Sequence, residues 1–277
     1  AHPLHSFPND DPDALPQPVA EAFPVRWAAV PPAVLLLLAA MVFLSGANQA
    51  MFLDANQLLA RTGSPAVWSA ITLSGSVLGA MALLAPSLKT RPRLLASAFL
   101  AAPLAIVFSE GGKQAFDVMR PAGVLATESF NLIGQKLYVH SFPSGHATTA
   151  GLVAAAIVLA WPDPAGRLRA ALVALPAAVL IILSRLAVGA HWPLDLLVGA
   201  AGGWACGAFG VWLSGRLRFW ERPGVVRVMA TIVLATSLSL LFIKLGYPDA
   251  RLYQIGLGAW GIGGAAAALM RDREMPS

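Results

Sequence analysis

The stretch HSFPSGH, residues 140–146, stands where a polar loop meets the apolar run ATTAGLVAAAIVLA, residues 147–160. Such an apolar run predicts a buried helix, and Ser144 is well suited to cap its N-terminus. Gly145 lets the backbone approach an anion, which a helix N-terminus attracts. His146 adds a group that can move a proton. By itself, the stretch fits an ordinary helix cap as well as it fits an anion site.

The composition around this stretch indicates a membrane protein. The chain has 277 residues, of which 57% are hydrophobic and only 12% are charged, whereas soluble domains have about 25% charged residues. Apolar runs near the length needed to cross a bilayer recur along it, and we predict an all-α polytopic membrane bundle of about eight spans. The runs are residues 27–47, 66–86, 94–112, 146–161, 170–188, 194–213, 226–243 and 253–270.

The chain divides into three regions. Residues 1–25 are polar and contain six prolines, which predicts a disordered tail. Residues 26–214 hold the first six spans, and residues 215–277 hold two further spans and a short tail. Residues 51–61 are too polar to cross, and we expect them to form a short amphipathic helix at the membrane interface. The single Cys206 lies in an apolar run and is expected to pack there.

Positive charges predict the orientation. If eight spans alternate, twelve of the 19 lysines and arginines lie on one side, which is then the cytoplasmic side. These twelve are Arg26, Lys89, Arg91, Arg93, Arg167, Arg169, Arg216, Arg218, Arg222, Arg227, Arg271 and Arg273. We therefore expect a multi-pass protein of a bacterial inner membrane with both termini in the cytoplasm. The loop at 113–143 then faces outward. The net charge of +5 follows this pattern and does not indicate a nucleic-acid partner.

Three glycines form a small-residue stripe in the sixth predicted span: Gly199, Gly203 and Gly207. Small residues four apart on a helix let a second helix approach closely. We favour packing within the chain over dimerisation as the use of this stripe. The oligomeric state is not predicted.

Ionisable residues near the expected outer ends of the spans are candidates for function, because a charge inside a bilayer is costly. Lys113 and Arg120 stand seven residues apart, close to two helical turns. They are expected to project from one helix face, with Pro121 ending that helix. Two cations on one face favour an anion, although both side chains could instead reach lipid headgroups.

A second group of ionisable residues is Arg185, His191 and Asp195. Pro193 fits the first turn of a helix, so Asp195 falls in that turn, where the helix dipole favours a carboxylate. Its carboxylate can reach back to the imidazole of His191 and hold its tautomer. A lone His–Asp pair at this spacing is more often structural or part of a metal site, but no third ligand is apparent.

In order, the motifs read Lys-x6-Arg-Pro at 113–121, Pro-Ser-Gly-His at 143–146 and Ser-Arg-x5-His-x3-Asp at 184–195. This pattern resembles the type 2 phosphatidic acid phosphatase family. The resemblance implies a six-helix phosphatase core, to which the last two spans are an addition. Where many relatives continue with a second Arg-Pro, this chain has Ala122-Gly123. That departure leaves the substrate open.

The resemblance also implies roles for the residues. His191 is the expected nucleophile and forms a phosphohistidine, while Asp195 orients it. His146 is the expected general acid and then general base. The expected phosphate ligands are Lys113, Arg120, Ser144, Gly145 and Arg185. Three cations and a helix N-terminus match the charge of a phosphate, so no metal or other cofactor is expected.

The implied activity is hydrolysis of a lipid phosphate or diphosphate at the outer membrane face. Candidate substrates are undecaprenyl diphosphate, which we favour, phosphatidylglycerol phosphate, phosphatidic acid and lipid A phosphate. Phosphate transfer from one lipid to another through the same site is the main alternative. A vanadate-dependent haloperoxidase and an anion transporter are more distant ones. A transporter would explain the buried cations but not a His–Asp pair with a second histidine.

Overall fold

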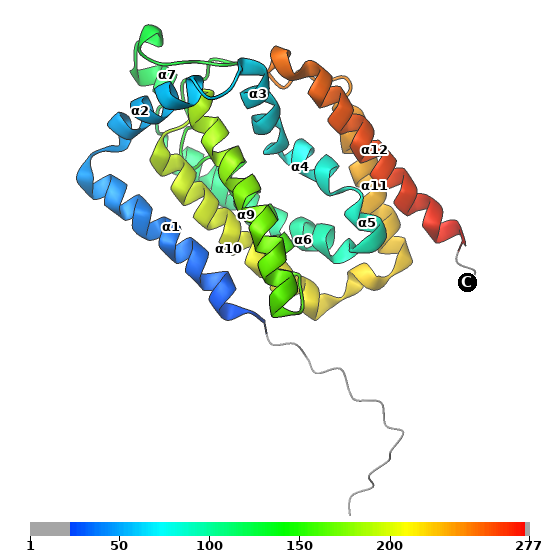
Figure 1. Cartoon of the computed structure of the whole chain (residues 1–277). Coiled ribbons are helices and arrows are strands. Elements are labelled where there is room, and N and C mark those ends of the chain that lie inside the picture. Colours follow the sequence, from blue (N-terminus) through cyan, green and yellow to red (C-terminus); the bar gives the residue numbers. More distant parts are fainter. Residues whose placement is uncertain (1–22, 275–277) are drawn as a thin grey trace, which may run out of the picture.

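The computed structural model describes residues 23–274, with side chains to residue 270, and these residues form a helical bundle without strands (Figure 1). The predicted all-α fold is confirmed, whereas the predicted tail falls almost wholly on residues 1–22, outside the described part. The long helices are α1 (Val25–Ser45), α6 (Pro92–Phe116), α8 (Gly145–Leu159), α9 (Pro164–Ala187), α10 (Pro193–Leu217), α11 (Pro223–Ser239) and α12 (Arg251–Glu274). The shorter ones are α2 (Asn48–Ala60), α3 (Pro65–Ser74), α4 (Val77–Leu84), α5 (Ser87–Thr90), α7 (Pro121–Val124), and the 3-10 turns η1 (Thr127–Ser129), η2 (Phe219–Glu221) and η3 (Pro248–Ala250).

All eight predicted apolar runs are helical, but fewer helices are long enough to span a membrane. Within residues 23–274, five helices qualify by length and composition: α1, α6 continued by α7, α9, α10, and α12 with η3. A sixth span exists if α3 and α4 count as one, and these two are bent by 74°. The apolar helices α8 and α11 have only 15 and 17 residues. A 15-residue helix is about 22 Å long, short of a bilayer core of about 30 Å.

The centre of the bundle is the close pairing of α8 with α10. The helix backbones approach so closely at the glycine stripe that a side-chain carbon at Gly203 would collide with the carbonyl oxygen of Thr148. At Gly207 such a carbon would lie 2.5 Å from the carbonyl oxygen of Leu152. The expected packing of the stripe within the chain is therefore confirmed. Cys206 is buried, as expected, against α6 and α8.

The predicted short helix at residues 51–61 corresponds to α2. Its Asn56 is fully buried and donates from Nδ2 to the carbonyl of Leu186 (2.8 Å), while its Oδ1 accepts from the N–H of Asn131 (2.7 Å). Asn48, the first residue of α2, accepts from the N–H of Leu194 through its Oδ1 (3.0 Å). Helix α2 thus ties together the end of α9, the loop at 131 and the start of α10.

The C-terminal helices α11 and α12 pack on each other and on the first half of the chain. Their shared core includes Met229, Val233 and Ala265, which meet Leu88 and Leu95 from α5 and α6. Figure 1 shows this pair beside α4 and α5, on the opposite side of the bundle from α1. In the same view α1 begins and α12 ends at one end of the bundle, and α7 lies at the other.

We predict that Gly203→Ala destabilises the protein by about 1–3 kcal/mol, because the added methyl group overpacks the contact between α8 and α10. Gly263→Ala in α12 is the matched control, since no atom lies within 4 Å of the position that its new carbon would take. Thermal unfolding in detergent measures both. Equal melting temperatures for the two variants would contradict the close approach of α8 and α10.

Candidate active site

Ser144 caps α8 as predicted. Its Oγ accepts from the N–H of Ala147 at 3.4 Å, and its own N–H donates to the carbonyl of Asp195 at 3.0 Å. The N–H groups of Gly145 and His146 lie in the first turn, where a helix provides no acceptor, and no other acceptor for them is found in residues 23–274. The start of α8 therefore presents two free donors together with the positive end of the helix dipole.

A cavity of about 380 Å³ extends from this helix start between α4, α6 and α8. Lys113, Gly145 and His146 line it together, and the rest of its wall is mainly apolar. Ser109 also lines it, and its buried Oγ has no hydrogen-bond partner among the described residues. The cavity thus has a polar end and an apolar end, which suit a molecule with a charged headgroup and an apolar tail.

Lys113 lies near the end of α6, where its Nζ pairs with Glu110 at 2.5 Å. The expectation that Lys113 and Arg120 share one helix face is wrong. Helix α6 ends at Phe116 and Asp117 adopts a left-handed conformation, so Arg120 lies beyond the helix. Pro121 ends no helix either, because it is the first residue of α7. A proline at the first position of a helix loses no hydrogen bond, which explains why the chain starts a helix there.

Arg120 is buried, and backbone carbonyls hold its guanidinium. Nε donates to Val139 (3.0 Å), Nη1 to Ala190 (3.0 Å) and Nη2 to His140 (3.2 Å). Nη1 also lies 3.1 Å from Nε2 of His191. An arginine only donates hydrogen bonds, so Nε2 of His191 must be the nitrogen that accepts.

His191 and Asp195 form the pair that the sequence predicted. Nδ1 of His191 lies 3.3 Å from Oδ2 of Asp195, which also accepts from the N–H of Trp192 at 2.9 Å. Since Nε2 accepts from Arg120, the imidazole is neutral with its proton on Nδ1, facing the carboxylate. Burial and then the charges of Arg120 and Arg185 hold the pKa of His191 well below its usual value, so this neutral form persists near pH 7.

Ser141 was not among the predicted site residues, and it is fully buried beside this pair. Its Oγ donates to Oδ2 of Asp195 at 2.5 Å and lies 3.4 Å from Nδ1 of His191. Ser141 therefore helps to fix the carboxylate that orients the imidazole. The one sign of this role in the sequence was that Ser141 lies within the stretch at 140–146, because the spacing from Ser141 to Asp195 follows no motif.

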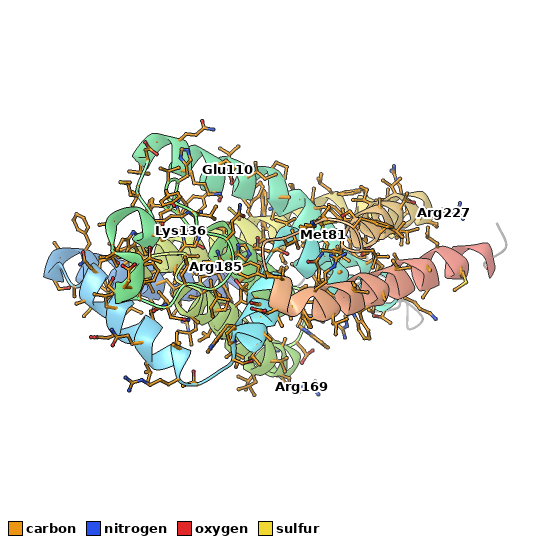
Figure 2. The ribbon with its side chains drawn as sticks, turned by 90° about the horizontal axis from the view of Figure 1, so that it is seen from above. Met81, Glu110, Lys136, Arg169, Arg185 and Arg227 are labelled. Carbon is orange, nitrogen blue, oxygen red and sulfur yellow. The ribbon has the colours of Figure 1, made fainter. Side chains whose placement is uncertain are left out.

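Arg185 lies on the last turns of α9 and is 3% exposed. Figure 2 shows it among the helices, whereas Arg169 and Arg227 lie at the outside of the bundle. Its Nη1 donates to Oγ1 of Thr72 (2.5 Å) and to Oη of Tyr247 (2.8 Å). Neither partner was predicted, because both lie far from the motifs in sequence.

The structure brings the eight predicted site residues to one region. His191, Asp195 and Arg120 are in direct contact, and Ser144 joins them through Asp195. Lys113, Arg120 and Arg185 all act electrostatically on both His146 and His191. Residues 23–270 contain no group of three histidine, cysteine or acidic side chains placed to bind a metal ion. The roles of these residues and the absence of a cofactor stay predictions.

The family pattern of the PAP2 superfamily matches residues 91–219. Two curated relatives are similar over short segments. The lipid A 1-phosphatase of Rhizobium etli is 46% identical over 65 residues, 23% of this chain and 25% of the relative. The lipid A 1-phosphatase of Rhizobium johnstonii is 42% identical over 74 residues, 27% of this chain and 25% of the relative. The chain thus spans about a quarter of the length of these relatives.

Two solved structures are similar over more of the chain. LpxE of Aquifex aeolicus is 27% identical, with a TM-score of 0.50 over 59% of this chain and 93% of that one. The transmembrane PAP2-type phosphatidylglycerolphosphate phosphatase of Bacillus subtilis is 21% identical, with a TM-score of 0.52 over 70% of this chain and 99% of that one. The second likeness concerns the fold alone. The family resemblance seen in the motifs is confirmed for residues 91–219, which match the PAP2 superfamily.

Proposed function

We propose that the protein is a lipid phosphatase that works through a phosphohistidine on His191. The observation that carries this proposal is the arrangement of the His191 ring. Its Nδ1 faces Asp195 at 3.3 Å, and its Nε2 accepts from Arg120 at 3.1 Å. A neutral imidazole with its lone pair on Nε2, pointing at a cationic group, is prepared to attack an anionic phosphoryl group that the cation holds.

The reaction has two steps. Nε2 of His191 bonds to phosphorus while the bond from phosphorus to the lipid oxygen breaks, and His146 gives that oxygen a proton. His146 then takes a proton from water, the water oxygen bonds to phosphorus, and the phosphorus–nitrogen bond breaks. Asp195 stabilises the charge on the His191 ring in the intermediate. Neutral His191 is restored, and inorganic phosphate leaves.

The phosphate would lie between the start of α8 and the three cations. The free N–H groups of Gly145 and His146 suit its oxygens, as do Lys113 and Arg185. The N–H that Arg120 directs at His191 would turn to a phosphate oxygen, because a charged acceptor binds it more strongly than an imidazole does. That movement would release the lone pair of Nε2 for attack.

The phosphate is expected at the outer end of the bundle. The candidate site lies near α7 and the loop before α8, and the described chain begins and ends at the opposite end (Figure 1). With both termini in the cytoplasm, as the basic loops predict, the site faces the periplasm or the outside. The apolar part of the cavity beside Lys113 would take the start of a lipid tail.

A lipid A phosphate is the substrate to test first. Both curated relatives are named lipid A 1-phosphatases, although the similarity covers only a quarter of each. Phosphatidylglycerol phosphate, another of the substrates expected from the sequence, is the second lipid to test. None of the four similar proteins is named for undecaprenyl diphosphate, the substrate that we favoured from the sequence. Phosphatidic acid completes a panel in which release of inorganic phosphate is counted with and without an acceptor lipid. Phosphate that appears on the acceptor instead of in solution would favour the phosphotransferase alternative.

His191→Ala should reduce phosphate release at least about a thousandfold, because the nucleophile is lost. The purified variant should keep the melting temperature of the wild type within a few degrees. His140→Asn is the matched control: His140 is exposed, and asparagine tolerates its left-handed backbone at φ 56°. Near-normal release by His191→Ala would sink the phosphohistidine mechanism.

Ser141→Ala should lower kcat about tenfold, a much smaller effect than loss of His191. The carboxylate of Asp195 would lose one charge-assisted hydrogen bond but keep the one from the Trp192 N–H. Steady-state kinetics on the best lipid substrate measures the effect. An unchanged kcat would show that the hydrogen bond from Ser141 to Asp195 does not contribute to the reaction rate.

EDTA should leave phosphate release unchanged. The side chains of Lys113, Arg120 and Arg185 and the start of α8 together balance a phosphate charge of about −1.5 to −2 without a metal ion. The assay is release of inorganic phosphate before and after dialysis against the chelator. Loss of activity that Mg²⁺ restores would argue against a metal-free site.

A further inference from the structure

The guanidinium of Arg185 is bonded on one nitrogen only. Nη1 carries two N–H groups, and both have acceptors, Oγ1 of Thr72 at 2.5 Å and Oη of Tyr247 at 2.8 Å. Nε is buried and has no hydrogen-bond partner among the described residues. Nη2 likewise has no hydrogen bond to any residue that the structure describes. The edge of the guanidinium that joins Nε and Nη2 is therefore unused.

That edge is suited to bind an oxyanion. Nε–H and one N–H of Nη2 are parallel, and such a pair forms a bidentate hydrogen bond to a phosphate or carboxylate. A buried donor without a partner is costly, so its persistence here points to a ligand. Because Nη1 is saturated, rotation of the guanidinium would break bonds to Thr72 and Tyr247. These two hydroxyl groups thus decide which edge remains available.

Tyr247 comes from the turn that joins α11 to η3, outside the PAP2 domain at 91–219. Two side chains of α12 hold this turn. Arg251 donates from Nη1 to the carbonyl of Ile243 at 3.0 Å, and Gln254 donates from Nε2 to the carbonyl of Leu240 at 2.6 Å. The C-terminal helices therefore hold the Tyr247 hydroxyl in place.

The Tyr247 ring is also fixed by packing on the core domain. It rests against Gly134, where a side-chain carbon would lie 2.6 Å from the ring. It also packs on the buried cluster that contains Ile133 and Val188. Val188 follows α9 directly, so the ring contacts the same segment that carries Arg185. The contact thus couples the C-terminal helices to the site.

We propose that Tyr247 is a positioning residue for Arg185, supplied by the C-terminal pair α11 and α12. With Thr72, it holds Nη1 so that the Nε and Nη2 edge meets the phosphate already oriented. Fixing a long side chain before the ligand arrives lowers the entropy lost on binding. This inference rests on the proposed function only in taking Arg185 as a phosphate ligand. It gives the two helices outside the PAP2 domain a part in the site.

The test measures affinity for inorganic phosphate with the full-length protein in detergent, from the rise of melting temperature with phosphate concentration. Tyr247→Phe should weaken phosphate binding about tenfold, because one hydrogen bond to a charged group is lost. Tyr253→Phe is the matched control: it removes a hydroxyl of α12 that bonds to Ser74 at 2.6 Å. This control should keep the phosphate affinity of the wild type. Equal phosphate affinity in Tyr247→Phe and Tyr253→Phe would overturn the proposal.

Two further variants separate positioning from general stability. Thr72→Val removes the other acceptor and should also weaken phosphate binding about tenfold, which keeps the test valid if Tyr247→Phe folds poorly. In an Arg185→Lys background, Tyr247→Phe should cause no further loss of phosphate affinity, because the guanidinium that Tyr247 orients is gone. A second tenfold loss in that background would mean that Tyr247 acts without Arg185, and would overturn the proposal.

The outcomes also distinguish this inference from the proposed function. A wild type that phosphate stabilises but that releases no phosphate from any lipid would contradict the phosphatase, while the affinities of the variants would still decide the role of Tyr247. A wild type that phosphate does not stabilise would remove Arg185 as a phosphate ligand, and the inference with it. If the enzyme is active, Tyr247→Phe should raise KM for the lipid more than it lowers kcat.

Discussion

The hydrogen bond from the N–H of Ser144 to the carbonyl of Asp195, 3.0 Å long, is the contact on which the rest of the site depends. It joins the start of α8 to the first turn of α10. Gly199 makes it possible, because a side-chain carbon there would lie 2.7 Å from the carbonyl oxygen of Ser144. His146 follows Ser144 by two residues, and His191 precedes Asp195 by four, so this hydrogen bond fixes the segments that carry both histidines. The small residues between α8 and α10 are therefore needed for the proposed chemistry as much as the two histidines are.

The site also has to keep three cations together in a largely apolar bundle. Each is held differently: Lys113 by the carboxylate of Glu110, Arg120 by three backbone carbonyls, and Arg185 by two neutral hydroxyl groups. A buried cation with only neutral partners is stabilised when an anion arrives. The incomplete compensation at Arg185 is thus consistent with a site that binds a phosphate and releases it.

The motif residues could be predicted because local rules govern them. Ser144 before a long apolar run predicted a cap, and Pro193 two residues before Asp195 placed that carboxylate in a first helical turn. The rule of helical spacing failed between Lys113 and Arg120, because α6 ends at Phe116. A left-handed residue at a helix end is commonly glycine, and here it is Asp117, so no signal marked the end.

The sequence by itself determined the helical class, the motif residues that resemble the PAP2 superfamily and the cap at Ser144, since periodicity, composition and capping act over a few residues. Only the tertiary structure decided which residues meet across the bundle. Ser141 reaches Asp195 over 54 positions, Thr72 reaches Arg185 over 113, and Tyr247 reaches it over 62. Contacts at such separations follow from how close helices can pack and where their ends fall, and no local pattern of residues encodes either.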